Sequence, residues 1–177
     1  MAIWPQHRVV MVEAFARTYG WAALLVLGTF AGPAHAVDCP TFIARLTEAG
    51  PLLPAQVKPV ANMPVGYYEF DGLSQIKGGL RCKSGALDTV GATALSGAAD
   101  VMQSWSLIVA RSLEVVAPGA FKTGKVADAI GHAKADAAKN HAALGVATGS
   151  GQVQFGDWYL SVVIIPNVGL QFEISGD

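Results

Sequence analysis

The pattern of apolar and polar positions is clearest between residues 151 and 175, where it predicts three antiparallel strands joined by short turns. In the first and third segments apolar and polar residues alternate, so each strand has one face of each kind. The middle segment, Trp158 to Ile165, is apolar on both faces, which is typical of a central strand. Gly156-Asp157 and Pro166 to Gly169 suit the two turns. The face expected to pack inward comprises Val153, Phe155, Leu160, Val162, Leu170, Phe172 and Ile174.

Three segments have the three- and four-residue apolar spacing of amphipathic helices. The longest regular stripe predicts a helix over Ala98 to Val116. An alanine-rich helix is expected over Lys125 to Leu144, with Thr123 as its N-cap, and its small residues indicate close packing or a peripheral position. A short helix is expected over Cys39 to Ala49, with Pro40 in its first turn.

The rest of the chain is less regular. Tyr67 to Lys83 predicts one or two strands, interrupted at Asp71-Gly72 and at Gly78-Gly79, whereas Gly85 to Ser96 fits either a strand or a loop. Four prolines punctuate Pro51 to Val65. Its apolar residues indicate an ordered, extended segment laid across the core rather than a linker or a proline-rich binding motif.

These elements predict an α+β fold. We expect a two-layer sandwich, in which a mainly antiparallel sheet of four or five strands carries two or three helices on one face. The chain has 177 residues, which allows one ordinary domain and a targeting segment. A single α+β domain is therefore expected over residues 37–177.

Residues 1–36 have the pattern of a secretory signal peptide. Two arginines precede the apolar run Trp21 to Ala31, and Ala34-His35-Ala36 matches the small-x-small cleavage pattern. The run is well short of the roughly 20 residues that a membrane-spanning helix needs. Met11 is an alternative start of the same signal. We expect an exported bacterial protein, periplasmic or secreted, whose mature chain begins at Val37 and has no transmembrane span.

Two cysteines remain after such a cleavage, Cys39 and Cys82. In an exported chain a pair of cysteines predicts one disulfide. A redox site is disfavoured because the sequence has no C-x-x-C, and a metal pair is disfavoured because no histidine is nearby.

Charge and motifs give little support to catalysis. The net charge of −1 creates no field that favours nucleic acid. Asp128, His132 and Asp136 share a helix face at four-residue steps, but a solvated polar stripe explains them better than a catalytic or metal-binding group. No nucleophile motif occurs. Thr148 to Gly151 lacks the lysine of a phosphate loop, so we expect a flexible connection there. No catalytic residue, metal ligand or cofactor is predicted.

Two function classes stay open. The first is a non-catalytic envelope domain that binds another envelope protein or a small ligand through a sheet face or edge. The alternative is a small exported hydrolase that uses Asp128, His132 or other acidic residues. The outward face of the 151–175 meander is apolar in its middle, so we expect something to cover it: the chain's own Pro51 to Val65 segment or an external partner. The residues predicted to bind are Tyr159, Val163, Ile165, Gln171 and Glu173. The pattern does not indicate an oligomeric state.

Overall fold

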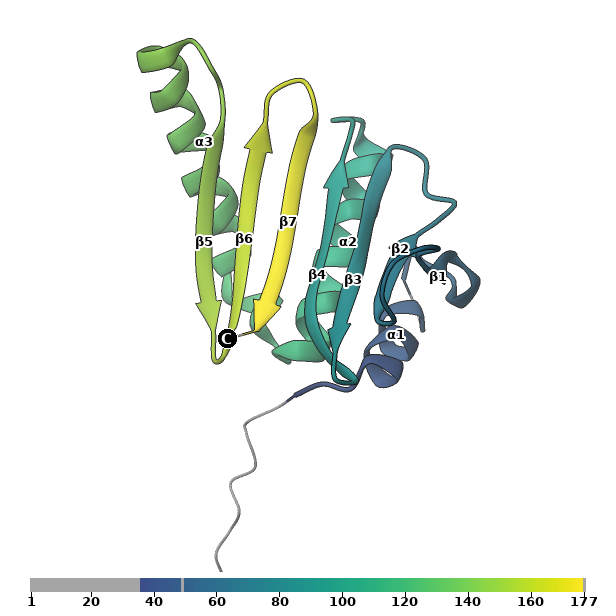
Figure 1. The fold of residues 1–177 in the computed structure, drawn as a ribbon. Coiled ribbons are helices and arrows are strands. Elements are labelled where there is room, and N and C mark those ends of the chain that lie inside the picture. Colours follow the sequence, from purple (N-terminus) through teal and green to yellow (C-terminus); the bar gives the residue numbers. More distant parts are fainter. Residues whose placement is uncertain (1–35, 49, 177) are drawn as a thin grey trace, which may run out of the picture. The chain divides into compact units, whose positions relative to one another are not determined.

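The computed structural model describes residues 36–48 and 50–176, which form an α+β fold (Figure 1). Within these residues, seven strands form one antiparallel sheet in the order β1-β2-β3-β4-β7-β6-β5. The prediction of four or five strands is therefore wrong. The strands are β1 (Val57–Pro59), β2 (Tyr67–Phe70), β3 (Ile76–Lys83), β4 (Ala86–Ala94), β5 (Gly149–Phe155), β6 (Trp158–Ile165) and β7 (Gly169–Gly176). The predicted signal peptide lies outside the described residues, except for Ala36.

The described helices all lie on the same side of the sheet, behind the strands in the view of Figure 1. They are α1 (Cys39–Thr47), α2 (Ala99–Val116) and α3 (Lys125–Leu144), with short 3-10 turns η1 (Pro54–Gln56) and η2 (Ala120–Thr123). Helix α2 lies over β4 and β7, α3 lies over β5 and β6, and η2 joins the two helices. All three helices were predicted near these bounds. The N-cap of α3 is Gly124, not the expected Thr123. The Thr123 hydroxyl donates to the Ala120 carbonyl at 2.7 Å and accepts from the Lys125 N–H at 3.4 Å.

The predicted 151–175 meander is confirmed as β5, β6 and β7. Leu160 pairs with Ile174 and Val162 with Phe172, so their side chains form continuous rows on the helix side. These four side chains are completely buried. Trp105 of α2 packs its ring edge-on against Phe172, and its indole N–H donates to the Ala92 carbonyl at 3.0 Å. The core therefore forms between the middle of the sheet and α2.

The two uncertain segments of the middle of the chain are both strands. Gly85 to Ser96 contains β4, which pairs with β3 on one side and β7 on the other. Strand β3 is its neighbour in the sequence, but β7 lies far along the chain, and local pattern cannot show that pairing. Gly78 and Gly79 do not interrupt a strand as predicted, since both lie inside β3 and pair with Ala92 and Gly91.

The contact of α3 with β5 depends on residues without side chains. A Cβ atom on Gly149 would lie 2.1 Å from the Ala133 carbonyl oxygen, and one on Gly151 would lie 2.0 Å from that of Ala129. Only glycine allows this approach, and the alanines on the helix complete it. The prediction of a flexible connection at Thr148 to Gly151 is therefore wrong, because β5 begins at Gly149. The close packing expected of α3 is confirmed.

The segment Pro51 to Val65 does not cross the core. It contributes the edge strand β1, which pairs with β2 at the end of the sheet furthest from β5. Leu52 and Val57 are buried, but Leu53, Met63 and Val65 are 62%, 50% and 101% exposed. The apolar character of this segment therefore did not predict burial, since an edge strand can bury one side while its loops stay in solvent.

Cys39 and Cys82 form the predicted disulfide, with their Cα atoms 6.2 Å apart. The bond joins the first residue of α1 to β3. Asp38 is the N-cap of α1: its carboxylate accepts from the Thr41 N–H at 3.0 Å, and this bond lowers the pKa of Asp38. Among the described helices, none is long and apolar enough to cross a membrane.

Candidate functional site

The face of the sheet opposite the helices has no described helix or strand in front of it (Figure 1). We call it the open face. Side chains alternate along each strand, and the register continues across the sheet, so alternate residues of all seven strands contribute to it. Its residues are Lys58, Tyr67, Glu69, Lys77, Gly79, Arg81, Thr89, Gly91, Thr93, Ser150, Gln152, Gln154, Tyr159, Ser161, Val163, Ile165, Gly169, Gln171, Glu173 and Ser175.

All five residues predicted to bind lie on the open face, but they do not form one cluster. Val163 lies directly opposite Gln171, on neighbouring strands. Tyr159 and Ile165 are near opposite ends of β6, roughly 20 Å apart at the usual rise of a strand. Glu173 is exposed and the other four are half-buried. Their part in binding stays a prediction.

The expected cover of this face by the chain itself is wrong. Pro51 to Val65 lies at the β1 edge, and β6 is separated from β1 by four strands. Tyr159, Val163 and Ile165 are not fully buried under any described residue, so they remain accessible to an external partner.

A hollow of about 340 Å³ lies on the open face, over β3 and β4. Its floor is formed by Gly79 and Gly91, which are opposite each other in the register and leave the backbone uncovered. Lys77 and Arg81 line it from β3, and Glu173 lines it from β7. A cation-bearing wall and a carboxylate-bearing wall therefore face each other across two residues without side chains.

The glycines of this floor are required by the backbone. A Cβ atom on Gly79 would lie 2.2 Å from the Tyr68 carbonyl oxygen, and one on Gly91 would lie 2.7 Å from that of Phe172. Contacts this short do not occur with backbone atoms, so neighbouring strands would have to move apart. The hollow is thus built into the sheet and does not depend on the position of a flexible side chain.

The two cationic residues of the hollow have different environments. Arg81 forms an ion pair and a hydrogen bond with Asp88. The hydrogen bond to Asp88 raises the pKa of Arg81, and a weaker contribution comes from Tyr67. Lys77 forms no ion pair or hydrogen bond among the described residues, although its charge contributes, after Lys58, to lowering the pKa of Asp71. Glu173, on the opposite wall, likewise has no polar partner there. Lys77 and Glu173 therefore have charges available for a ligand, while Arg81 has a fixed orientation.

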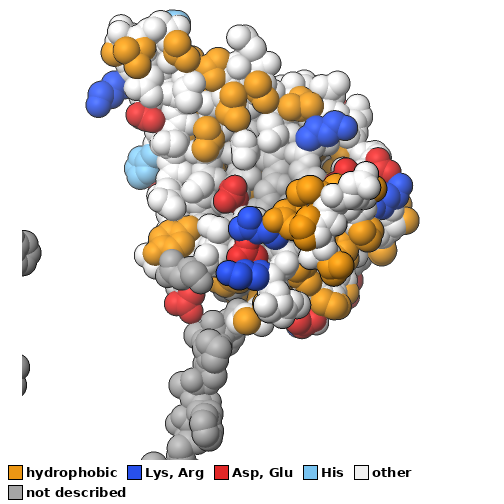
Figure 2. Space-filling model, in the orientation of Figure 1, with side chains coloured by type: hydrophobic (Ala, Val, Ile, Leu, Met, Phe, Trp, Pro, Cys, Tyr) orange, Lys and Arg blue, Asp and Glu red, His pale blue; other side chains and the backbone are white. Residues whose placement is uncertain are grey.

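Figure 2 shows the distribution of charge on the open face. Blue and red side chains gather over β3 and toward β1 and β2, whereas white and orange ones predominate over β5, β6 and β7. A further ion pair, between Lys58 and Asp71, lies at the β1 edge, where the Lys58 hydrogen bond lowers the pKa of Asp71. The charged half of the face contains the hollow, and the uncharged half contains Tyr159 and Val163.

Two acidic residues, Glu69 and Glu173, occupy open-face positions on strands that are not neighbours. Glu69 and Glu173 lie in the same register row with β3 and β4 between them. Three strand spacings separate their Cα atoms by roughly 14 Å. Glycosidase carboxylates lie roughly 5–9.5 Å apart. The Glu69 and Glu173 carboxylates would come within that range only if both side chains leaned toward each other across β3 and β4, so the register by itself does not arrange them as an acid and base pair.

The Asp128, His132 and Asp136 face of α3 has a structural use. Asp136 accepts a hydrogen bond from the Ser150 N–H at 3.0 Å, and this bond holds the outer edge of β5. Asp128 and His132 are exposed. In the described part of the chain, no group of three or more His, Cys, Asp or Glu residues could hold a metal ion.

Both edges of the sheet are blunted against added strands. At the β5 edge, the Asp136 carboxylate accepts from the Ser150 N–H near the start of the strand. Near its end, Lys125 donates to the Gln154 carbonyl at 3.2 Å. At the β1 edge, Val60 donates to Tyr67, so even-numbered residues point their backbone groups toward β2. The odd-numbered Pro59 therefore faces outward, and because proline has no backbone N–H it offers no donor to an added strand. A partner is thus better accommodated by the open face than by either edge.

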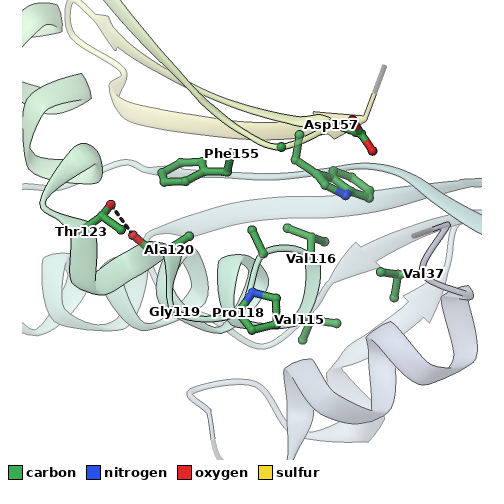
Figure 3. Close-up of a pocket in the computed structure, with 12 residues that line it drawn as sticks. Val37, Val115, Val116, Pro118, Gly119, Ala120, Thr123, Phe155 and Asp157 are labelled. Atoms are coloured by element: carbon green, nitrogen blue, oxygen red, sulfur yellow. Dashed lines mark hydrogen bonds between the residues drawn. The ribbon is translucent and has the colours of Figure 1, made fainter. Parts of the chain in front are cut away.

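A second hollow, of about 600 Å³, lies on the helix side at the β5–β6 hairpin (Figure 3). Figure 3 shows Phe155 on one side of it, Val116 and Ala120 on the other, and Val37 at the end away from Thr123. The lining is largely apolar, with Asp157 as its ionisable residue. Phe155 and Val116 are themselves 8% and 7% exposed, so the hollow is a shallow continuation of the core surface.

Comparison with known proteins gives no relative: no protein-family model, curated protein or solved structure matches this chain.

Sequence reasoning missed the hollow over Gly79 and Gly91. Each glycine was visible in the sequence, and Gly78-Gly79 was interpreted as a break. The signal that could have found the site was the alternation of Lys77, Gly79 and Arg81, which places one cationic residue on each side of a residue without a side chain. Pairing with Gly91 and the approach of Glu173 depend on the strand order, which the sequence pattern did not give.

Proposed function

We propose that this protein is an exported, non-catalytic binding domain of a bacterial envelope, and that the open face binds another envelope protein. The single observation that carries the proposal is the preformed hollow over Gly79 and Gly91, with opposite charges on its walls. A two-layer sandwich, with helices on one side of a single domain over residues 37–177, leaves the other side free for this purpose. The Cys39–Cys82 disulfide and the Ala34-His35-Ala36 cleavage pattern are compatible with export.

The chemistry of the hollow favours a partner segment that carries charges of both signs. A carboxylate of the partner would lie near Lys77 and Arg81, and an ammonium or guanidinium group near Glu173. The volume of about 340 Å³ accommodates a few side chains. The half-buried Tyr159 and Val163 would then continue the contact across the uncharged half of the face.

The test is quantitative co-purification of the protein with cross-linked partners from its native envelope. We expect Glu173→Gln to reduce the yield of a specific partner about three- to tenfold, because it removes a charge that faces the partner. Tyr159→Glu should reduce the same partner, because it places a charge in the apolar centre of the contact.

The matched controls are Asp128→Asn and His132→Glu on α3, which make the same kinds of change on the helix side. They should leave the partner yield unchanged. Equal yields from Glu173→Gln, Tyr159→Glu and both controls would refute the open face as the binding surface, provided that circular dichroism shows all four variants to be folded.

A further inference from the structure

The helix layer leaves a groove uncovered at one end of the molecule. Helices α2 and α3 are joined through η2 at the β5–β6 hairpin end, whereas α2 begins and α3 ends at the β6–β7 turn end (Figure 1). Because α2 lies over β4 and β7 and α3 over β5 and β6, they follow different strands as they leave η2. A hollow of about 550 Å³ lies at the β6–β7 turn end.

The burial of the sheet residues beneath the helices shows where this groove opens. Leu160, Val162, Phe172 and Ile174 point toward the helices and are 0% exposed. Ile164 and Leu170 are the next pair in the same rows, opposite each other in the register, and both are half-exposed. The floor of the groove is thus the continuation of the core, at a place where the helices no longer cover it.

The lining of this groove combines apolar surface with one charge. Met102 of α2 forms one wall, and Lys134 of α3 lies on the other. Leu95 and Val168 at the rim are 39% and 42% exposed. Among the described residues that line the groove, Lys134 is the only ionisable one, and it has no ion pair there. An apolar chain with an anionic head group matches this combination.

We propose that the groove between α2 and α3 binds a free long-chain carboxylate. The alkyl chain would cover Ile164 and Leu170 and contact Met102, whose flexible side chain adapts to a ligand. The carboxylate would accept a charge-assisted hydrogen bond from the Lys134 ammonium group. The volume of about 550 Å³ lies within the range of small-molecule sites in proteins. This site lies at the β6–β7 turn, mainly on the helix side, and Ile165 and Gly169 of the open face reach its lining. It does not depend on the function proposed for the open face.

The test uses isothermal titration of the purified protein with dodecanoate, dodecanol and dodecyltrimethylammonium, each below its micelle-forming concentration. We expect saturable one-to-one binding of dodecanoate, weaker binding of dodecanol and the weakest binding of the ammonium compound. Lys134→Met should weaken dodecanoate binding about three- to fivefold, as for an exposed charge pair, and leave dodecanol binding unchanged. Lys139→Met, an exposed lysine of the same helix outside the groove, should alter neither.

A blocking variant separates this groove from other apolar surface on the chain. Ala147 lines the groove and is exposed, so Ala147→Trp adds bulk at its mouth without changing the core. It should abolish binding of dodecanoate and dodecanol alike. Dodecanoate binding that persists in Ala147→Trp, that is insensitive to Lys134→Met, or that is absent from the unmodified protein would overturn the proposal. Binding to phosphatidylglycerol vesicles in place of dodecanoate would also overturn it, because the groove would then contact a membrane surface.

Discussion

Two buried hydroxyl groups in this protein have opposite environments. Thr47, at the end of α1, donates from Oγ1 to the Ile43 carbonyl at 2.9 Å. Ser112, in the C-terminal part of α2, is 0% exposed and its Oγ has no hydrogen-bond partner among the described residues. A buried hydroxyl without a partner lowers stability, because it loses its bonds to water and gains nothing in exchange.

Removing the two hydroxyls should therefore have opposite effects on the free energy of unfolding. We expect Ser112→Ala to raise it by about 1 kcal/mol, with a small further gain from the helix propensity of alanine. Thr47→Val keeps the shape but loses a hydrogen bond, so it should lower the free energy by about 1 kcal/mol. Urea denaturation measures both. A loss of stability in Ser112→Ala would mean that Oγ has a partner in solution, such as a buried water.

At the residue scale the sequence predicted the inner face of the meander well and the Pro51 to Val65 segment poorly. Alternation identifies the inward residues of a paired strand because its geometry repeats every two residues. The apolar residues Leu53, Met63 and Val65 have no such repeat, and the structure leaves them exposed. Apolar composition alone does not locate a residue, since much of any protein surface is apolar.

At the scale of elements, the pairing of α3 with β5 explains two features that looked unrelated in the sequence. The helix is rich in alanine, and the strand begins with glycine at alternate positions. In the structure the Ala129 and Ala133 backbone fits against Gly149 and Gly151 with no room for an added Cβ. The sequence showed the small residues on each side, but which helix approaches which strand depends on contacts between distant parts of the chain.

The two glycines at positions 131 and 151 should respond oppositely to alanine. A Cβ on Gly151 would lie 2.0 Å from the Ala129 carbonyl oxygen, so Gly151→Ala should push α3 from the sheet and cost about 2 kcal/mol. Gly131 is on the outer side of α3, where an added Cβ meets nothing within 4 Å. Gly131→Ala should stabilise by about 0.5–1 kcal/mol. Thermal denaturation of both variants checks this, and a tolerated Gly151→Ala would contradict the close contact.

At the scale of the whole molecule, the number of strands and their order were beyond the local pattern. The sequence predicted the β5–β6–β7 meander, but β7 pairs with β4 as well, and this joins it to a second set of strands. That junction places Glu173 beside Gly91 and so completes the hollow of the open face. A candidate site built across such a junction is visible only when both sets of strands are in place.

The disulfide connects the N-terminal end of α1 to β3. Its contribution to the free energy of unfolding is the property of the whole chain that can be tested most directly. Cys39 and Cys82 are 43 residues apart, and closing a loop of that length removes conformational entropy from the unfolded chain. We expect reduction to lower the free energy of unfolding by about 4 kcal/mol. Helix α1 should be released first, because Cys39 is its first residue. Denaturation with and without reductant, combined with hydrogen exchange of α1 amides, measures both effects.

The double variant Cys39→Ala with Cys82→Ala is the control: its free energy of unfolding should match that of the reduced protein and should not change with reductant. Unchanged stability after complete reduction would show that packing of Phe42 and Leu46 alone holds α1 in place.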